Sequence, residues 1–532
     1  MSVAVVPHRC TVLRSGTAFA NAHQPRMDST FATMIDRVLL TLLATGLTAL
    51  TLNAQEHPKR TLEVQINGTA KDTVYLANYY GNKLYYADTA VADAKGTAVF
   101  KSPKGYAAGV YAVVVPGPKY FEVILNEPLV QLATDKADLL GKLQVKKSKE
   151  NELFIGYIRF LNEKKLEGDA LRAQLDVNKD PIARNSVKAK MEDLDKAVKQ
   201  YQRDLIANNP GTLAASLVRM GMTVDLPEPR KADGSLDSAA SYYQYRAHFW
   251  DNVDLKDDRI VRIPVFANKF DEYFSKLVPQ VPDTINRLAD ELIARIGNVE
   301  EVFKYVVHNI TYKYENSDIM GMDAVFVHMA LTYYCPRDGK PGRVTWMEQD
   351  KLDKLCERAR KMSPLVLGRK APNIILTDST EQKWISMYDI PAEYVVIIFW
   401  DPHCGHCKKE LPDIHKVYLE RLKPMGIEVY AVAKAVDASL LKDWKKFIRE
   451  NDLKWVDVAL TQTVYEEAKK DARKYIPRYT TLESLNYADT YDVYSTPKVF
   501  LVDGDRKFVG KSLSADQIED LVTKLRERKA KK

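Results

Sequence analysis

Residues 400–412 read WDPHCGHCKKELP, with cysteines at Cys404 and Cys407. The apolar run of residues 394–399 before them is rich in β-branched side chains and predicts a strand buried on both faces of a sheet. After Cys407, apolar side chains return at helical spacing, beginning with Leu411 and Ile414. We therefore expect the two cysteines where a central strand ends and a helix begins.

This position has chemical consequences for the two thiols. Unpaired N–H groups at a helix N-terminus favour negative charge, so we expect Cys404 to be stabilised as a thiolate. His406 can add positive charge or a hydrogen bond. The thiolate is the attacking species, and Cys407, one helical turn further on, can then close an intramolecular disulfide.

Two other uses of a C-x-x-C pair fit this sequence less well. Half of a zinc site needs a second ligand pair of similar spacing, which the sequence lacks. Haem attachment needs a histidine where Lys408 stands. The motif therefore predicts redox chemistry with no metal and no organic cofactor.

Residues 363–530 resemble the thioredoxin fold. The resemblance rests on Trp400, four residues before the first cysteine, on Pro412, five after the second, and on Thr496-Pro497 before another strand-like run. It implies that Pro497 is cis, faces the cysteine pair, and has neighbouring backbone that pairs with substrate. Trp400, Thr496 and Pro497 are accordingly the implied substrate-binding residues.

The end of the motif, residues 408–412, resembles one group of thioredoxin-fold proteins in particular. It is similar to membrane-associated and periplasmic thiol-disulfide oxidoreductases of the cytochrome-maturation or redoxin type, which carry a glutamate where Glu410 stands. Thioredoxin's buried aspartate is replaced by Ile398. Glu410 is therefore the candidate for proton transfer near the cysteines, with an ordinary surface glutamate as the alternative. The Cys-Gly-His-Cys tetrad resembles that of protein disulfide isomerases, which leaves the direction of electron flow open.

The rest of the 532-residue chain predicts further domains, because single cores rarely exceed about 300 residues. Residues 60–147 alternate apolar and polar side chains between turn signals and predict a β-sandwich-like domain. Residues 148–362 are mainly helical in pattern, with a short heptad repeat over 191–205. Near the end, Ser514 and Gln517 predict a capped final helix.

The whole layout resembles exported bacterial thioredoxin-like proteins in which an N-terminal β domain and a helical domain, both of unknown function, precede the thioredoxin-like domain. The expected fold is therefore multidomain α+β and α/β. It comprises a β-sandwich-like domain, a central all-α domain, and a catalytic thioredoxin fold over 363–532 with a mixed sheet flanked by helices.

The N-terminal residues predict export. Residues 1–33 show no apolar run and are interpreted as an unstructured extension upstream of the true translation start. Residues 34–54 contain Arg37, a short apolar core and a final small residue, the pattern of a signal peptide. The core is shorter than the ~20 residues of a spanning helix. The expected location is the bacterial periplasm, which is oxidising. An uncleaved anchor in the inner membrane is the alternative.

The composition limits the classes of protein to which this chain can belong. A hydrophobic fraction of 46% with 28% charged residues indicates a globular protein, and a net charge of +7 gives no reason to expect nucleic-acid binding. Five cysteines are too few for a disulfide-built scaffold. Cys335 and Cys356 flank a turn-rich segment. They could form a structural disulfide, remain two buried thiols, or relay electrons to Cys404.

The sequence thus predicts thiol-disulfide exchange on exported proteins. Its substrates would be protein thiols and disulfides, and its electron donor a membrane or periplasmic protein. One alternative is an envelope binding protein with an accessory thioredoxin-like domain. Another is a peroxide-reducing redoxin. Such an enzyme requires the pattern Pro-x-x-x-Thr/Ser-x-x-Cys before its reactive cysteine, and residues 400–404 do not match it.

Overall fold

The structure is a computed structural model that describes residues 57–117 and 119–531. The expected extension and signal peptide, residues 1–54, lie outside this range. Within the described residues the chain forms two compact units, which are treated separately below. The first comprises residues up to 279 and 292–305, and the second comprises 280–291 and those from 306 onward.

The first unit begins with strands. They are β1 (Thr61–Asn67), β2 (Thr73–Tyr80), β3 (Lys83–Val91), β4 (Thr97–Lys101), β5 (Gly109–Val115), β6 (Lys119–Leu125), β7 (Leu129–Asp135) and β8 (Gln144–Lys147). One sheet has the order β4-β1-β7-β8 and the other β3-β2-β5-β6. In β1 the alternate residues Leu62, Val64 and Ile66 are fully buried. The predicted β region is therefore present, and the packing of its sheets as a sandwich stays a prediction.

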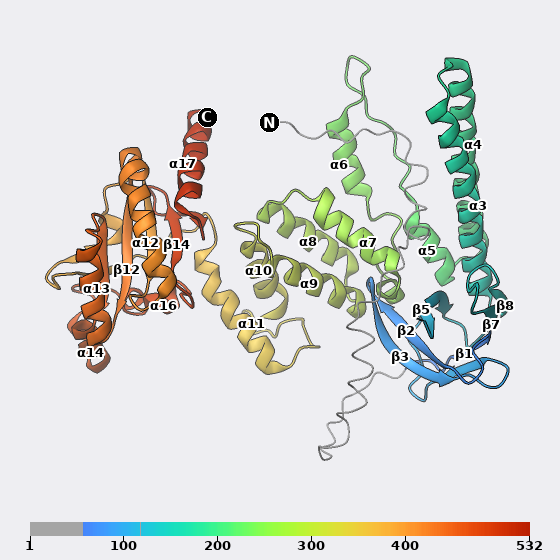
Figure 1. The fold of residues 1–532 in the computed structure, drawn as a ribbon, viewed down its shortest axis with the longest axis horizontal. Helices are drawn as coiled ribbons and strands as arrows, with labels where there is room; N and C mark the ends of the chain where they lie inside the picture. The colour runs from blue at the N-terminus through green and yellow to red at the C-terminus, as the bar shows by residue number, and fades with distance from the viewer. Residues whose placement is uncertain (1–56, 118, 532) are drawn as a thin grey trace. The chain divides into compact units, whose positions relative to one another are not determined.

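Helices follow in the first unit. They are α3 (Lys149–Val177), α4 (Pro181–Asn208), α5 (Leu213–Gly221), α6 (Ser238–His248), η1 (Asp258–Arg262), α7 (Pro264–Glu272) and η2 (Tyr273–Leu277), where η marks a short 3₁₀ or π helix. Helices α3 and α4 form a long hairpin, which Figure 1 shows as two neighbouring helices. Their contact buries Leu171 against Met191 and Leu194, so the heptad positions serve packing within this hairpin.

Further helices lead to the C-terminal domain. Helices α8 (Pro282–Ile296) and α9 (Glu300–Glu315) contribute residues to both units. The second unit continues with α10 (Asp323–Met329), η3 (Ala330–Tyr334), α11 (Gln349–Met362) and η4 (Ser363–Leu365). The central region is thus helical, as predicted. In the part of the chain that the structure describes, no helix is sufficiently long and apolar to span a bilayer.

The C-terminal domain is built on one mixed sheet. Its strands are β9 (Ile375–Asp378), β10 (Trp384–Ser386), β11 (Tyr394–Trp400), β12 (Ile427–Ala435), β13 (Val456–Thr461), β14 (Lys498–Val502) and β15 (Phe508–Lys511), in the order β10-β9-β13-β12-β11-β14-β15. Strand β11 runs parallel to β12 and antiparallel to β14. Every residue of β11 is buried, as the apolar run predicts.

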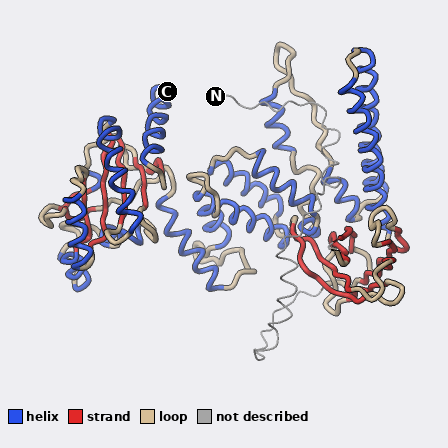
Figure 2. The backbone as a smooth tube through the Cα atoms, in the orientation of Figure 1, coloured by secondary structure: helices blue, strands red, loops and turns tan. Residues whose placement is uncertain are grey.

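Helices cover both faces of this sheet, as Figure 2 shows with strands in red and helices in blue. They are η5 (Met387–Asp389), α12 (Gly405–Val417), η6 (Tyr418–Leu422), η7 (Lys423–Met425), α13 (Ala438–Glu450), α14 (Gln462–Lys470), η8 (Ala472–Lys474), α15 (Leu482–Leu485), α16 (Tyr487–Thr490) and α17 (Ala515–Ala530). One face packs against α12, α13 and α17 and the other against α14 and α16. The final helix has the predicted capping box of Ser514 and Gln517.

Candidate active site

The first cysteine caps the N-terminus of helix α12. Strand β11 ends at Trp400, α12 begins at Gly405, and Cys404 is the N-cap residue between them. The Cys407 N–H donates to the Cys404 sulfur over 3.4 Å. A sulfur at this position faces unpaired amides and the positive end of the helix dipole, which favours the thiolate. The predicted placement at a strand-to-helix junction is therefore found.

A cis proline lies against this cysteine. The Thr496–Pro497 peptide bond is cis, and Pro497 directly precedes strand β14. The Cys404 thiol donates to the Thr496 carbonyl oxygen over 3.4 Å. The backbone of Thr496 therefore lies directly beside the Cys404 sulfur.

The two thiols differ in exposure and in acidity. Cys404 is partly exposed, whereas Cys407 has no exposed surface. Burial opposes ionisation of Cys404, but hydrogen bonds with Cys407 and with the Thr496 side chain outweigh it and lower the pKa of Cys404 below its ordinary value. Burial raises the pKa of Cys407, and the adjacent Cys404 sulfur raises it further. This pair therefore has one accessible, acidic thiol and one buried thiol that is held neutral.

Two ion pairs flank the cysteines. The His403 ring lies 2.8 Å from Asp443 Oδ2 on α13, and Lys434 on β12 lies 3.3 Å from Asp401 Oδ2. The Asp401 carboxylate also accepts the His403 N–H over 2.8 Å. Neither pair could be predicted from the sequence, because each joins residues more than 30 positions apart and no local pattern indicates such a contact.

The other predicted site residues have different positions. His406 and Glu410 are both exposed on α12, and no described residue forms a hydrogen bond or ion pair with the Glu410 side chain. Glu410 follows Cys407 by three residues, so the two share one side of the helix. Trp400 is only 1% exposed and packs 5.0 Å from the Phe447 ring, measured between centroids. Trp400 therefore belongs to the same core as Cys407 and has little surface to offer a substrate.

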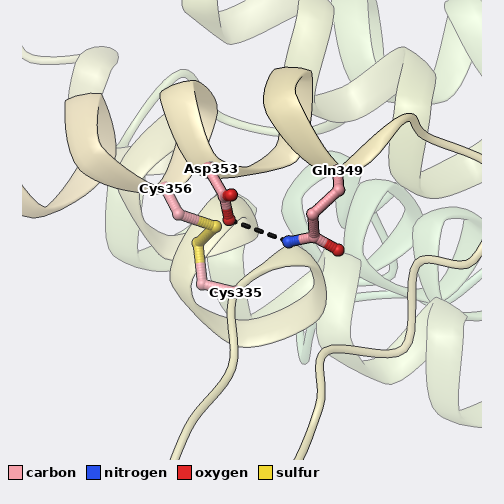
Figure 3. Close-up of a disulfide and its surroundings, with 4 residues drawn as sticks. All are labelled: Cys335, Gln349, Asp353 and Cys356. Atoms are coloured by element: carbon pink, nitrogen blue, oxygen red, sulfur yellow. Dashed lines mark hydrogen bonds between the residues drawn. A yellow bond between two sulfur atoms is a disulfide. The ribbon is translucent and has the colours of Figure 1, made fainter.

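The remaining cysteines are joined to each other. Cys335 and Cys356 form a disulfide that links the segment after η3 to helix α11, and both residues are buried. Figure 3 shows this bond beside the Gln349–Asp353 hydrogen bond of 2.8 Å on the same helix. Among residues 57–117 and 119–531, no cluster of three or more histidine, cysteine or acidic side chains could hold a metal ion.

Family comparisons match three segments of the chain. Residues 367–509 match the AhpC/TSA family. Residues 234–362 match a domain of unknown function, DUF5106, and residues 61–154 match another, DUF4369. The segment that matches the AhpC/TSA family contains the cysteine pair, whereas the other two segments match domains of unknown function.

Individual curated relatives match a part of the chain. The thiol-disulfide oxidoreductase ResA of Bacillus cereus is 28% identical over 156 residues, which cover 29% of this chain and 74% of ResA. ResA of Bacillus thuringiensis subsp. konkukian is 27% identical over 169 residues, covering 31% of this chain and 82% of the relative. ResA of Bacillus subtilis is 38% identical over a shorter stretch of 65 residues, 12% of this chain and 35% of the relative.

Solved structures give related matches. The thioredoxin domain of a thiol-disulfide oxidoreductase from Bacteroides vulgatus is 28% identical, with a TM-score of 0.24, and the match covers 30% of this chain and 97% of that one. A thioredoxin-like protein from Bacteroides caccae is 17% identical, with a TM-score of 0.38, covering 57% and 99%. From the family match, the curated relatives and the geometry of the cysteine pair together, residues 367–509 are a thioredoxin-like domain and the protein is a thiol-disulfide oxidoreductase.

Proposed function

We propose that the protein exchanges thiols and disulfides of exported proteins, with Cys404 as the nucleophile and Cys407 as the resolving thiol. The observation that carries this proposal is the position of the Cys404 sulfur. It caps α12, lies 3.4 Å from the Thr496 carbonyl oxygen, and has the buried Cys407 one turn deeper. An accessible thiolate is what a disulfide-containing chain needs in order to react.

In the first step, the Cys404 thiolate attacks one sulfur of a substrate disulfide. The substrate S–S bond breaks, a mixed disulfide between Cys404 and the substrate forms, and the other substrate sulfur leaves as a thiolate that takes up a proton. The lowered pKa of Cys404 supports this role, because it increases the fraction of attacking thiolate. The backbone at Thr496 and Pro497 is proposed to align the substrate segment.

In the second step, Cys407 loses its proton and attacks Cys404 Sγ. The Cys404–Cys407 disulfide forms, and the second substrate thiol is released, so that two electrons have passed to the substrate. Because the Cys407 thiol is held neutral by burial, this step needs a proton acceptor, and Glu410 on the same side of α12 is proposed for it. His406 is proposed to favour the thiolate electrostatically from the surface.

A reductase cycle is completed by an electron donor, proposed to be a membrane or periplasmic dithiol protein. In the oxidising direction the same bonds form and break in reverse order, starting from the Cys404–Cys407 disulfide. No metal or organic cofactor takes part in either direction of this scheme.

We further propose that the protein works in the periplasm. The signal-peptide pattern of residues 34–54 supports export, although these residues lie outside the described structure. The buried Cys335–Cys356 disulfide supports an oxidising compartment, because such bonds are rare in the reducing cytosol. An uncleaved anchor at the inner membrane is compatible with both observations.

Reduction of insulin disulfides tests the proposal. The wild-type protein is expected to reduce insulin with dithiothreitol as electron donor, and Cys404→Ser is expected to lose this activity. Equal rates for the two proteins would refute the proposed function. Trapping in whole cells with Cys407→Ala, which stops the cycle at the mixed disulfide, followed by mass spectrometry of all trapped partners, is expected to identify exported substrates. Mixed disulfides with cytosolic proteins alone would refute the assignment to exported substrates.

A further inference from the structure

The turn between strand β11 and helix α12 is closed by one residue, Asp401. Its carbonyl oxygen accepts the Cys404 N–H over 2.9 Å, and its side-chain oxygen Oδ1 accepts the His403 N–H over 2.8 Å. An aspartate that accepts from the backbone two residues further on fixes a turn in the same way as a backbone hydrogen bond. Asp401 therefore sets the direction in which the backbone of Cys404 enters α12.

The Asp401 carboxylate is itself held from the sheet. Its second oxygen, Oδ2, lies 3.3 Å from Nζ of Lys434, and the Asp401 side chain is only 19% exposed. Lys434 follows Ala433 on β12, and Ala433 pairs with Trp400 at the end of β11. The lysine thus belongs to the part of β12 that lies beside the start of the turn. Because each carboxylate oxygen has a different partner, rotation of the Asp401 side chain breaks at least one of these contacts.

A second contact holds the same turn from helix α13. The His403 ring lies 2.8 Å from Asp443 Oδ2 and 3.5 Å from the Ser439 hydroxyl oxygen. Both Asp443 and Ser439 are residues of α13, which packs against the same face of the sheet as α12. The two polar side chains that precede Cys404 in the turn are therefore attached to different elements, Asp401 to β12 and His403 to α13.

The position of the Cys404 sulfur decides how strongly its thiolate is stabilised. The sulfur accepts the Cys407 N–H over 3.4 Å, and hydrogen bonds weaken steeply when their geometry is disturbed. The helix dipole likewise acts only within the first turn of the helix. An ion pair as exposed as that of Asp401 and Lys434, in which the lysine side chain is 51% exposed, adds little to the free energy of folding. The pair therefore contributes to the geometry of the turn more than to stability.

We propose that Asp401 is a positioning residue whose carboxylate, held by Lys434, keeps the Cys404 sulfur at the N-terminus of α12, where its thiolate is stabilised. Lys434 is a positioning residue that acts through Asp401. Asp401 also contacts the resolving cysteine, because its backbone N–H bonds to the Cys407 sulfur and opposes the rise in the pKa of Cys407 that burial causes. This inference rests on the proposed function, since it concerns the thiolate that attacks the substrate disulfide.

The pH dependence of Cys404 alkylation by iodoacetamide, in the reduced full-length protein, tests this role. Asp401→Ala removes the acceptor for the His403 N–H and should raise the midpoint by about one pH unit, a tenfold loss of thiolate at a pH below both midpoints. Asp401→Asn keeps an oxygen acceptor and should stay within about half a unit of the wild type. Reduction of hydroxyethyl disulfide, a small substrate, should slow only about threefold in Asp401→Ala, because the remaining thiolate is more nucleophilic.

The sign of the shift separates position from charge. Loss of the Asp401 charge alone would lower the pKa of the Cys404 thiol, because a nearby negative charge disfavours the thiolate. A rise in Asp401→Ala therefore reports a displaced sulfur. Lys434→Met should raise the midpoint of the wild type and add nothing in Asp401→Ala, since the lysine acts through the carboxylate. Asp413→Asn, which removes a charge from an exposed position on α12, is the control and should leave the midpoint unchanged.

A midpoint in Asp401→Ala equal to or below that of the wild type would overturn the inference, as would a further rise when Lys434→Met is added. Lys434→Met changes an exposed side chain, so an unchanged midpoint in this variant overturns the inference even if Asp401→Ala does not fold. Failure of the proposed function gives a different result, because Cys404→Ser would then still reduce hydroxyethyl disulfide. If Cys404→Ser is inactive and the midpoint of Asp401→Ala is unchanged, the mechanism stands and the role of Asp401 is wrong.

Discussion

Ile398 and Asp457 lie in one cross-strand row of the C-terminal sheet. Ile398 on β11 pairs with Ala431 on β12, which pairs in turn with Asp457 on β13. Asp457 shares its face with Ala459, which belongs to the same core as Cys407. The resemblance to thioredoxin would place a buried aspartate at the position of Ile398. In this sheet the buried aspartate is Asp457, which lies two strands away from that position.

Asp457 should make stability depend on pH. Its Oδ1 atom is buried without a hydrogen-bond partner among the described residues, and burial raises the pKa of Asp457 to about 7. The unfolded chain ionises near the ordinary value of 3.8. The folded state therefore holds the proton longer, and its stability falls as the pH rises from about 4 to about 7.

The substitution Asp457→Asn removes this titration. Urea denaturation measures the free energy of unfolding of the variant and of the wild type at each pH. The variant's value minus that of the wild type should increase by about 1 to 3 kcal/mol between pH 4 and pH 8. Asp452→Asn, at an aspartate that is 78% exposed, is the matched control and should show no such trend. A difference for Asp457→Asn that stays constant over this pH range would contradict the assignment.

Glu410→Gln should slow the second chemical step and leave the first unchanged. If the Glu410 carboxylate takes the proton from Cys407, its loss should reduce the rate of mixed-disulfide resolution about tenfold or more. The attack by Cys404 should keep its rate, because that thiol is already acidic. Rapid-quench kinetics with a single disulfide peptide resolve the two steps.

Lys409→Gln is the control for Glu410→Gln, because Lys409 is also exposed on α12 and precedes Glu410 directly. Both variants should unfold with nearly the wild-type free energy, since neither side chain is buried. A normal resolution rate in Glu410→Gln would show that Glu410 is an ordinary surface residue and that another group accepts the proton.

Removal of the second disulfide should reduce stability and spare the chemistry. The bond between Cys335 and Cys356 spans 21 residues, and the double substitution to alanine should lower the free energy of unfolding by about 3 kcal/mol. Reduction of hydroxyethyl disulfide should be unaffected, because this disulfide is buried and structural. Loss of that activity in a protein that remains folded would instead indicate the electron relay to Cys404.

The sequence predicted the features that local patterns encode. The apolar run of β11 and the helical spacing after Cys407 located the strand-to-helix junction, and Ser514 with Gln517 located the cap of α17. The cis isomer at Pro497 followed from a family resemblance, because no local pattern distinguishes cis from trans proline.

The contacts that complete the site join distant parts of the chain and could not be predicted in this way. Asp443 on α13 contacts His403, and Lys434 on β12 contacts Asp401. The burial of Asp457 could not be predicted, because it depends on helices that pack over the sheet. A short strand with one acidic residue otherwise resembles an exposed edge.

The acidity of the Cys404 thiol is the property on which the mechanism depends most directly. The decisive measurement is the rate of iodoacetamide alkylation at Cys404 as a function of pH, with the reduced full-length protein digested and the Cys404 peptide quantified by mass spectrometry. The hydrogen bonds from the Cys407 N–H and with the Thr496 side chain predict a midpoint below that of free cysteine, about 8.5. A midpoint at or above the value of free cysteine would contradict the account.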